Sequence, residues 1–257
     1  MVDTAKSGHI GGSLSAIDII TVLYYSAMRI DPKNPRDPAR DRFVLSKGHV
    51  TPALYSTLAA RGFFPEDDLA TYRQLDSYLS GHAEMTKVPG VDMSTGSLGQ
   101  GLSAALGMAL AARIDNLDYR VYAMVGDGEI QEGQIWEAAM AAAQFGADNL
   151  VLFIDNNDLQ IDGTIGEVMS PYPIDAKFAA FGWQVETIDG HDLGVIGHAI
   201  RRAGVEDKPT VIIAKTVKGK GVSFMENDLQ WHGGVPSPEQ FAAAYAEIDR
   251  RLAELEG

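Results

Sequence analysis

The sequence predicts an α/β fold: a doubly wound, mostly parallel sheet with helices on both faces. Three observations favour this class. Segments with helical spacing of apolar residues alternate along the chain with short β-type runs. These runs are mainly apolar rather than alternating, as expected for strands that are buried on both faces. Two of the runs end in oxygen-bearing polar residues, at the edge where such sheets bind ligands.

The elements follow from local patterns. Apolar runs predict strands over residues 42–45, 120–125, 150–154, 183–188 and 210–214. Periodicity predicts helices over residues 14–28, 52–61, 65–72, 98–114, 135–145, 192–203 and 238–256. Ser13 and Asp192 are the expected N-caps of the first and sixth helices, and Pro52 and Pro65 suit the first helical turn. Helices 98–114 and 135–145 are rich in small residues, which indicates burial or an interface.

Composition restricts the function. The chain has 257 residues, 46% of them apolar and 22% charged, as in a globular domain, and we expect one domain over residues 1–257. It has no cysteine, which excludes disulfides and thiolate metal sites. The net charge of −14 makes nucleic acid and anionic membranes unsuitable partners. No membrane-spanning run or basic-apolar leader is evident, so we expect a cytoplasmic protein.

Polar residues follow two of the predicted strands. The first strand ends in Gly126-Asp127-Gly128-Glu129 and the next in Asp155-Asn156-Asn157. Asp127 and Asn157 are 30 residues apart, about the length of one βαβ unit, so adjacent strands would bring them together. Carboxylate and amide oxygens suit Mg²⁺ or Ca²⁺, with water and phosphate completing the shell. Ordinary strand-end turns are the alternative, but the spacing favours a metal and diphosphate site.

This pattern is typical of thiamine diphosphate enzymes, and the flanking residues resemble transketolases over residues 6–236. The motifs that carry the resemblance are Ser7-Gly8-His9, residues 41–49, Gly81-His82-Ala83-Glu84, residues 94–101, Gly126-Asp127-Gly128, residues 155–163 and Trp231-His232-Gly233. The resemblance implies a thiamine diphosphate-binding fold with bound Mg²⁺ or Ca²⁺.

The resemblance also implies roles for single residues. The implied metal ligands are Asp127, Asn157 and the carbonyl of Leu159. The implied catalytic residues are His9, His49, His82 and His232, which line a substrate channel, and Glu132, a buried interface glutamate that connects paired active sites. The implied cofactor-binding residues are His49, Gly96, Ser97, Leu98, Gly126, Asp127, Gly128, Glu129, Asn157 and His232.

Single-chain transketolases have three consecutive domains, and this sequence matches the first of them. The resemblance therefore implies the N-terminal subunit of a split transketolase, which transfers a two-carbon ketol unit from a ketose (phosphate) to an aldose. We expect a separate C-terminal subunit, in an α2β2 heterotetramer. Because family members have a helix ahead of the Ser7 motif, we also expect residues upstream of Met1. The sequence leaves open which sugars react, including pentose phosphates, sulfosugars and branched sugars.

Several alternatives remain at this stage. The chain could be a subunit of a deoxyxylulose-phosphate synthase-like enzyme, or a non-catalytic cofactor-binding subunit. An ordinary nucleotide-binding domain is disfavoured, because neither a Gly-x-Gly-x-x-Gly fingerprint nor a P-loop is found. His191, after another strand, is a weaker site candidate. Three interpretations of the basic loop 215–221 stay open: it contacts the diphosphate, it becomes ordered when a partner binds, or it is only solvated. The role of Lys47 is equally open.

Overall fold

The computed structural model describes residues 1–256 and contains a five-stranded sheet. The strand order is β1-β2-β3-β7-β6, and every neighbouring pair is parallel. The strands are β1 (Arg42–Leu45), β2 (Val121–Gly126), β3 (Leu150–Asn156), β6 (Gln184–Asp189) and β7 (Thr210–Lys215). The predicted parallel α/β fold is therefore confirmed, and all five predicted strands form.

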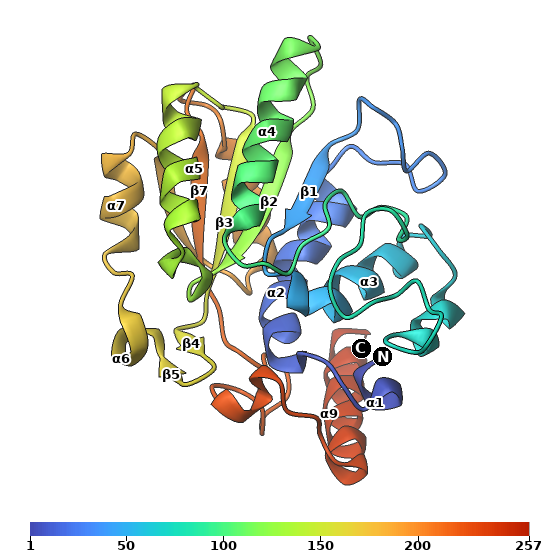
Figure 1. The fold of residues 1–257 in the computed structure, drawn as a ribbon. Coiled ribbons are helices and arrows are strands. Elements are labelled where there is room, and N and C mark those ends of the chain that lie inside the picture. The colour runs from blue at the N-terminus through green and yellow to red at the C-terminus, as the bar shows by residue number, and fades with distance from the viewer. Residues whose placement is uncertain (257) are drawn as a thin grey trace.

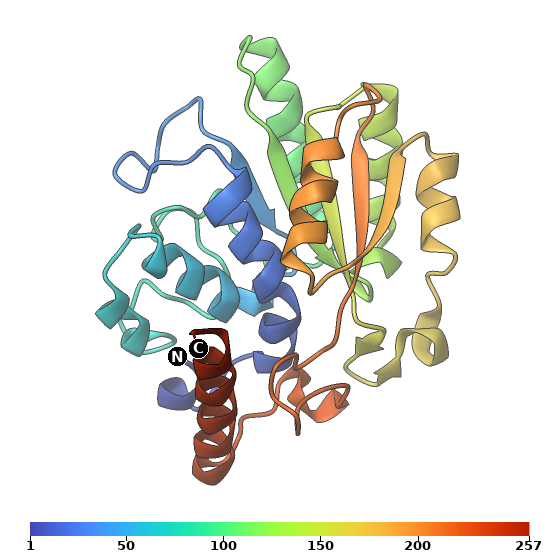
Figure 2. The same ribbon diagram turned by 180° about the vertical axis from the view of Figure 1, so that it is seen from behind.

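Helices cover both faces of the sheet (Figures 1 and 2). One face carries α4 (Gln100–Ile114), α5 (Gly133–Gln144) and α7 (Ile174–Ala180), and the other carries α2 (Ile10–Val22) and α8 (Leu193–Arg202). Beside α2 lies α3 (Thr51–Ala60), and α9 (Pro238–Glu256) packs near the short α1 (Val2–Ala5) beyond the carboxyl edge of the sheet.

Four of the five strands, β1, β2, β3 and β7, are mainly apolar because they contribute to two separate cores. The edge strand β6 is more polar and only partly buried. Phe43, Tyr122 and Phe153 face the core under α2 and α3. Their chain neighbours, such as Val44 and Ala123, face the core under α4 and α5. This double burial removes the alternation of apolar and polar residues that a half-exposed strand would show.

The predicted start of the first helix was wrong. The helix begins at Ile10 with His9 in the N-cap position, and no side chain caps it. Ser13 lies inside the helix, where its hydroxyl donates to the His9 carbonyl at 2.7 Å. The helix continues through a π-helical turn, η1 (Leu23–Ala27). Asp192, by contrast, does cap α8, because its Oδ1 accepts from the Val195 amide at 2.9 Å.

Other boundaries also differ from the sequence prediction. Residues 65–72 form a 3-10 helix, η3 (Glu66–Thr71), and α4 begins at Gln100 rather than at residue 98. The stretch between β3 and β6 contains the hairpin β4 (Leu159–Gln160) and β5 (Gly163–Thr164), followed by α6 (Ile165–Met169) and α7. The remaining 3-10 turns are η2 (Gly48–Val50), η4 (Glu129–Gln131) and η5 (Leu229–His232).

One helical stretch is long and apolar enough to span a membrane, contrary to the sequence expectation. It covers Ile10–Ala27, has a mean hydropathy of 1.3 and is 56% buried within the protein. Ala16, Ile19 and Ile20 are fully buried in the core under the sheet. This burial against the sheet accounts for the apolar character of the stretch.

Candidate active site

The predicted site residues gather around one cavity at the carboxyl edge of the sheet. The cavity has a volume of about 410 Å³. Its lining comprises His9, Gly12, Lys47, His49, His82, Gly96, Leu98, Gly126, Asp127, Gly128, Glu129, Gln131, Glu132, Asn157, Leu159, Gln160, Ile161, Asp162, Lys218 and His232. Of the residues predicted from the sequence, Ser97 alone is not part of this lining among residues 1–256, and its side chain is exposed.

Asp127 and Asn157 lie at the ends of neighbouring strands. Gly126 pairs with Asp155 in the sheet register, so the two polar turns leave the sheet side by side. Both carboxylate oxygens of Asp127 accept hydrogen bonds, including one from the Asp158 amide at 2.6 Å. Burial, followed by the charge of Asp155, raises the pKa of Asp127 to about 6. A cation beside Asp127 would oppose both effects.

The donor set fits a hard metal ion. Asn157 turns its amide nitrogen toward Asp155 Oδ1 at 3.4 Å, which leaves its oxygen on the side of Leu159. Asp127, this amide oxygen and the Leu159 carbonyl would offer three oxygen ligands. Within residues 1–256, no group of three His, Asp or Glu side chains is arranged to hold a metal. Water and ligand phosphate would therefore complete the coordination.

Glu129 holds the backbone of the cavity in place. Its side chain is buried and accepts hydrogen bonds from the Gly99 amide at 2.9 Å and the Gly126 amide at 3.0 Å. It also accepts from the Ser46 hydroxyl. Although Glu129 reaches the cavity wall, its oxygens are occupied by these donors, and it therefore orders the loops that surround a ligand.

Two lysines add positive charge to the cavity, and they differ in how they are neutralised. Lys47 Nζ lies 2.6 Å from Asp155 Oδ2, and both side chains are buried. Lys218 is only 2% exposed. Its ammonium lies 3.1 Å from His232 Nδ1, and within residues 1–256 it forms no ion pair with a carboxylate. Burial, followed by repulsion from Lys47, lowers the pKa of Lys218 to about 8.

Three histidines form a contiguous cluster. The ring of His9 lies 4.9 Å from that of His49 and 5.6 Å from that of His232. Burial is the main cause that lowers their pKa values, to about 4 for His9 and His232 and to about 2 for His49. His9 Nδ1 is buried without a hydrogen-bond partner. The cluster is therefore neutral, with hydrogen-bonding capacity left for a ligand.

His82 and Glu132 lie at the rim of the cavity. His82 is exposed and packs on Gly96, where a Cβ would come within 2.9 Å of the ring. Gly96 also has a φ of +145°, which favours glycine. Glu132 is exposed at the N-cap of α5, whereas the resemblance implied a buried glutamate. In the single chain its side chain is open to solvent.

The sequence left Lys47 and Lys218 undecided, gave no individual role to Gly12 or to residues 160–162, and did not indicate Gln131. The signal was available for the lysines, because Lys47 follows β1 and Lys218 follows β7 at the carboxyl edge of a parallel sheet. The hairpin residues 160–162 belong to the motif 155–163, but the resemblance implied no role for their side chains. His191 and His198 lie outside the cavity lining.

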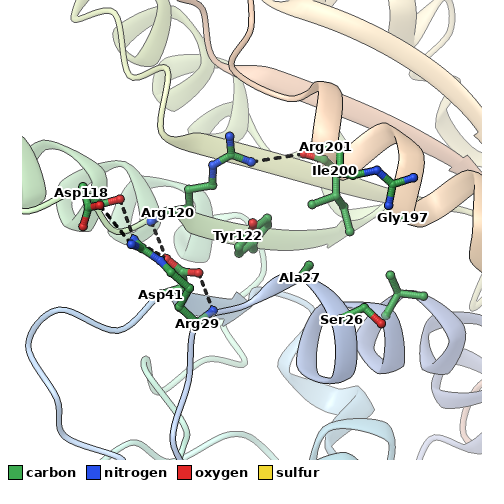
Figure 3. Close-up of a pocket in the computed structure, with 11 residues that line it drawn as sticks. Ser26, Ala27, Arg29, Asp41, Asp118, Arg120, Tyr122, Gly197, Ile200 and Arg201 are labelled. Atoms are coloured by element: carbon green, nitrogen blue, oxygen red, sulfur yellow. Dashed lines mark hydrogen bonds and ion pairs between the residues drawn. The ribbon is translucent and has the colours of Figure 1, made fainter.

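A second cavity of about 410 Å³ lies at the opposite edge of the sheet (Figure 3). Its charged side chains largely satisfy one another. Arg29 pairs with Asp41 and Asp118, and Arg120 donates to the carbonyls of Ile200 and Ala203. None of the site residues implied by the resemblance lines this cavity, so the cavity at the carboxyl edge is the better candidate.

Known proteins match this chain in sequence and in fold. The model of the family "Transketolase, thiamine diphosphate binding domain" matches residues 1–247. The chain belongs to the transketolase family. It therefore carries a thiamine diphosphate-binding domain, and the predicted family is confirmed.

The relatives are of two lengths. The chain is 47% identical to an apulose-4-phosphate transketolase subunit of Phocaeicola vulgatus, covering 100% of this chain and 91% of that protein. It is 48% identical to 6-deoxy-6-sulfo-D-fructose transketolase subunit SqwG of Clostridium sp. strain MSTE9, covering 96% and 90%. The human transketolase is 43% identical over 93% of this chain but only 38% of its own length.

A solved transketolase structure has the same fold as this chain. The crystal structure of the Campylobacter jejuni transketolase superposes with a TM-score of 0.91 at 36% identity, covering 96% of this chain and 40% of that one. The chain thus spans about two fifths of the solved transketolase and nearly all of two relatives that are named as subunits. The prediction of an N-terminal-type transketolase subunit is confirmed by these matches.

Proposed function

We propose that this chain is the cofactor-binding subunit of a two-subunit transketolase. With a separately encoded C-terminal subunit it would form an α2β2 heterotetramer in the cytoplasm and transfer a two-carbon ketol unit from a ketose to an aldose. The observation that carries the proposal is the convergence of Asp127, Asn157, Lys218 and a neutral histidine cluster on one cavity. The match to transketolase subunits supports it.

In this proposal the floor of the cavity holds Mg²⁺ and the diphosphate of the cofactor. Asp127, Asn157 and the Leu159 carbonyl supply oxygen ligands to the metal. Lys218, a buried cation without a carboxylate partner, supplies charge to the diphosphate. Gly126 leaves open space in front of the strand end, where a Cβ would meet only atoms 4.0 Å away.

Bound thiamine diphosphate supplies the carbanion that accepts the two-carbon unit. The residues of this chain orient the sugar and handle protons. His9 and His49 are neutral, so each has one donor and one acceptor nitrogen for hydroxyl groups. The Nδ1 of His232 accepts from the Lys218 ammonium at 3.1 Å, which leaves its Nε2–H as a donor. His82, at the rim, would contact the hydroxyls of the two-carbon unit in this proposal. An anionic ligand beside Lys218 would raise the histidine pKa values and favour proton transfer near neutral pH.

The names of two relatives support a proposal for the substrate class. These relatives act on apulose-4-phosphate and on 6-deoxy-6-sulfo-D-fructose, as their names state. Both sugars carry an anionic group, so we propose a phosphorylated or sulfonated ketose as the donor. The partner subunit would supply the residues that bind this anionic end.

The test is an assay of ketol transfer with thiamine diphosphate and Mg²⁺, with and without the separately encoded subunit. Activity from the mixture alone is the expected result. The variant His232→Ala should then lower the turnover of the assembled enzyme far more than its cofactor affinity. Unchanged turnover in this variant would remove His232 from the reaction, and an inactive mixture across sulfosugars and sugar phosphates would refute the proposed function.

A further inference from the structure

Two features that the sequence left undecided, His191 and the basic loop 215–221, meet in the structure. His191 follows β6 and has a side chain that is 12% exposed. Its Nδ1 lies 2.7 Å from Asp18 Oδ2, on α2. Its Nε2 accepts a hydrogen bond of 2.9 Å from the backbone amide of Val217, the residue before Lys218. The imidazole therefore bridges α2 and the loop that delivers Lys218 to the cavity.

These contacts define the tautomer of His191. A backbone N–H can only donate, so Nε2 must carry a lone pair. The proton of the neutral ring is then on Nδ1, where it is donated to the Asp18 carboxylate. Both ring nitrogens are occupied by the protein, and the side chain does not line the cavity. His191 is thus placed to hold the chain rather than to contact a ligand.

Neighbouring contacts also restrict the backbone of the loop 215–221. The Gly190 amide donates to the Lys215 carbonyl at 2.8 Å, and a Cβ on Gly190 would approach Thr216 Cγ2 to 2.5 Å. After Lys218, the Gly219 amide donates to the Gly11 carbonyl at 3.0 Å. The backbone is therefore fixed on both sides of Lys218, and the bond from Val217 to His191 is the side-chain contact nearest to it on the strand side.

An anchor is needed because the position of Lys218 is unfavourable. The ammonium is buried without a carboxylate partner, and a buried charge is more stable in water. If the Val217 amide lost its acceptor, it would be a second poorly satisfied group beside that charge. A small displacement of the loop would then solvate both groups and withdraw the ammonium from the cavity.

We propose that His191, held by Asp18, is a positioning residue that keeps the Lys218 ammonium directed at the diphosphate subsite. The inference rests on the proposed function for the identity of the ligand. The anchoring of the loop itself depends only on the contacts of this chain.

Two variants of His191 distinguish the contact made by Nε2 from the contact made by Nδ1. His191→Gln places an oxygen near the position of Nε2 and so retains an acceptor for the Val217 amide. His191→Asn is shorter and reaches toward Asp18 but not toward Val217. His198→Asn, at an exposed position of α8, is the matched control. The measurements are thiamine diphosphate affinity of the assembled enzyme with Mg²⁺, and amide hydrogen exchange over residues 215–221 of the chain alone.

We expect His191→Asn to weaken cofactor binding about tenfold, as the loss of one buried hydrogen bond predicts, and to speed exchange in the loop. Turnover of His191→Asn at saturating cofactor should fall by a smaller factor than its cofactor affinity. His191→Gln should restore both affinity and protection, and His198→Asn should match the wild type. In a Lys218→Met background, His191→Asn should have no further effect on affinity, because it acts through that lysine.

Equal behaviour of the Asn and Gln variants would overturn the inference, as would an undiminished effect of His191→Asn in the Lys218→Met background. A wild-type assembly that binds no cofactor would instead refute the proposed function. The exchange measurement on the chain alone would then still decide whether His191 anchors the loop.

Discussion

Replacing Lys218 with methionine should change stability and cofactor binding in opposite directions. The lysine is 2% exposed in a cavity where no carboxylate among residues 1–256 pairs with it. Methionine retains an unbranched stem of similar size without the charge. In the ligand-free chain, the substitution therefore removes an unfavourable buried charge and keeps most of the packing.

The lowered pKa of Lys218 sets the size of the expected change in the free energy of unfolding. The value falls from 10.5 to about 8 on folding, mainly because of burial. At about 1.4 kcal/mol for each pH unit, this corresponds to a penalty of about 3 kcal/mol for holding the charged form at neutral pH. We therefore expect Lys218→Met to raise the free energy of unfolding of the ligand-free chain by about 1–3 kcal/mol, since relaxation and water entry reduce the full value.

The pH dependence has a definite sign. Between the folded pKa of about 8 and the unfolded value of 10.5, the unfolded chain binds more protons at Lys218 than the folded chain does. The stability contribution of this group therefore rises with pH across that interval. The gain in the free energy of unfolding of Lys218→Met over the wild type should be complete below about pH 8 and should shrink toward pH 10.

Urea unfolding of the ligand-free chain at pH 7 and pH 9.5 measures this effect, and calorimetric titration of the assembled enzyme measures the cofactor affinity. Lys220→Met is the control, because Lys220 lies in the same loop but is partly exposed and 3.8 Å from Glu226. The affinity should fall at least tenfold in Lys218→Met and hardly change in the control. A destabilised Lys218→Met chain with unaltered cofactor affinity would refute the reasoning.

Three further outcomes are expected. In NMR spectra of the ligand-free chain, the imidazole signals of His9 and His232 should keep their neutral-form chemical shifts from pH 8 down to about pH 5. The reason is that burial lowers both pKa values to about 4, and a titration near pH 6.5 would contradict this. Gly48→Ala should cost about 1–3 kcal/mol in urea unfolding, because its Cβ would lie 2.5 Å from Thr95 Oγ1 and 2.8 Å from the Gly96 amide; an unchanged midpoint would show that the loop yields freely. Arg40→Met should cost about 3–5 kcal/mol, because it leaves the buried Asp92 carboxylate without its guanidinium partner, and thermal unfolding that matches the wild type would contradict this.

The convergence of Asp127 and Asn157 was accessible from the sequence because sheet geometry links strand ends. A spacing of one βαβ unit places Asp127 and Asn157 on adjacent parallel strands, and β2 and β3 are adjacent with Gly126 opposite Asp155. The positions of β2, β3 and β7 were also accessible, since strands buried on both faces are mainly apolar. The first helix start was not, because the helix begins without a side-chain cap and Ser13 looks like one.

What the sequence could not supply are the contacts between residues distant in the chain. Lys47 and Lys218 look alike in sequence, and only the structure shows that Asp155 neutralises one of them. The same limit applies to His191, whose two bonds reach back to Asp18 and forward to Val217. The depressed pKa values of the histidines likewise arise from their mutual burial, which no single motif encodes.

The charges of the cavity indicate why the metal and the diphosphate would bind together in the proposed function. Asp155 is fully buried and is matched by Lys47, so this pair is balanced before any ligand enters. The Glu129 carboxylate is satisfied by three hydrogen-bond donors. Of the buried charged groups at the cavity, Asp127 and Lys218 then remain, the first with a raised pKa and the second with a lowered one. Each of these shifts means that burial opposes the charged form, and a ligand of opposite charge would relieve it. A cation alone would favour the ionised Asp127 but repel Lys218, and a diphosphate alone would do the reverse. A metal–diphosphate pair satisfies both residues at once, so a protein with a net charge of −14 can still bind an anion at this edge of its sheet.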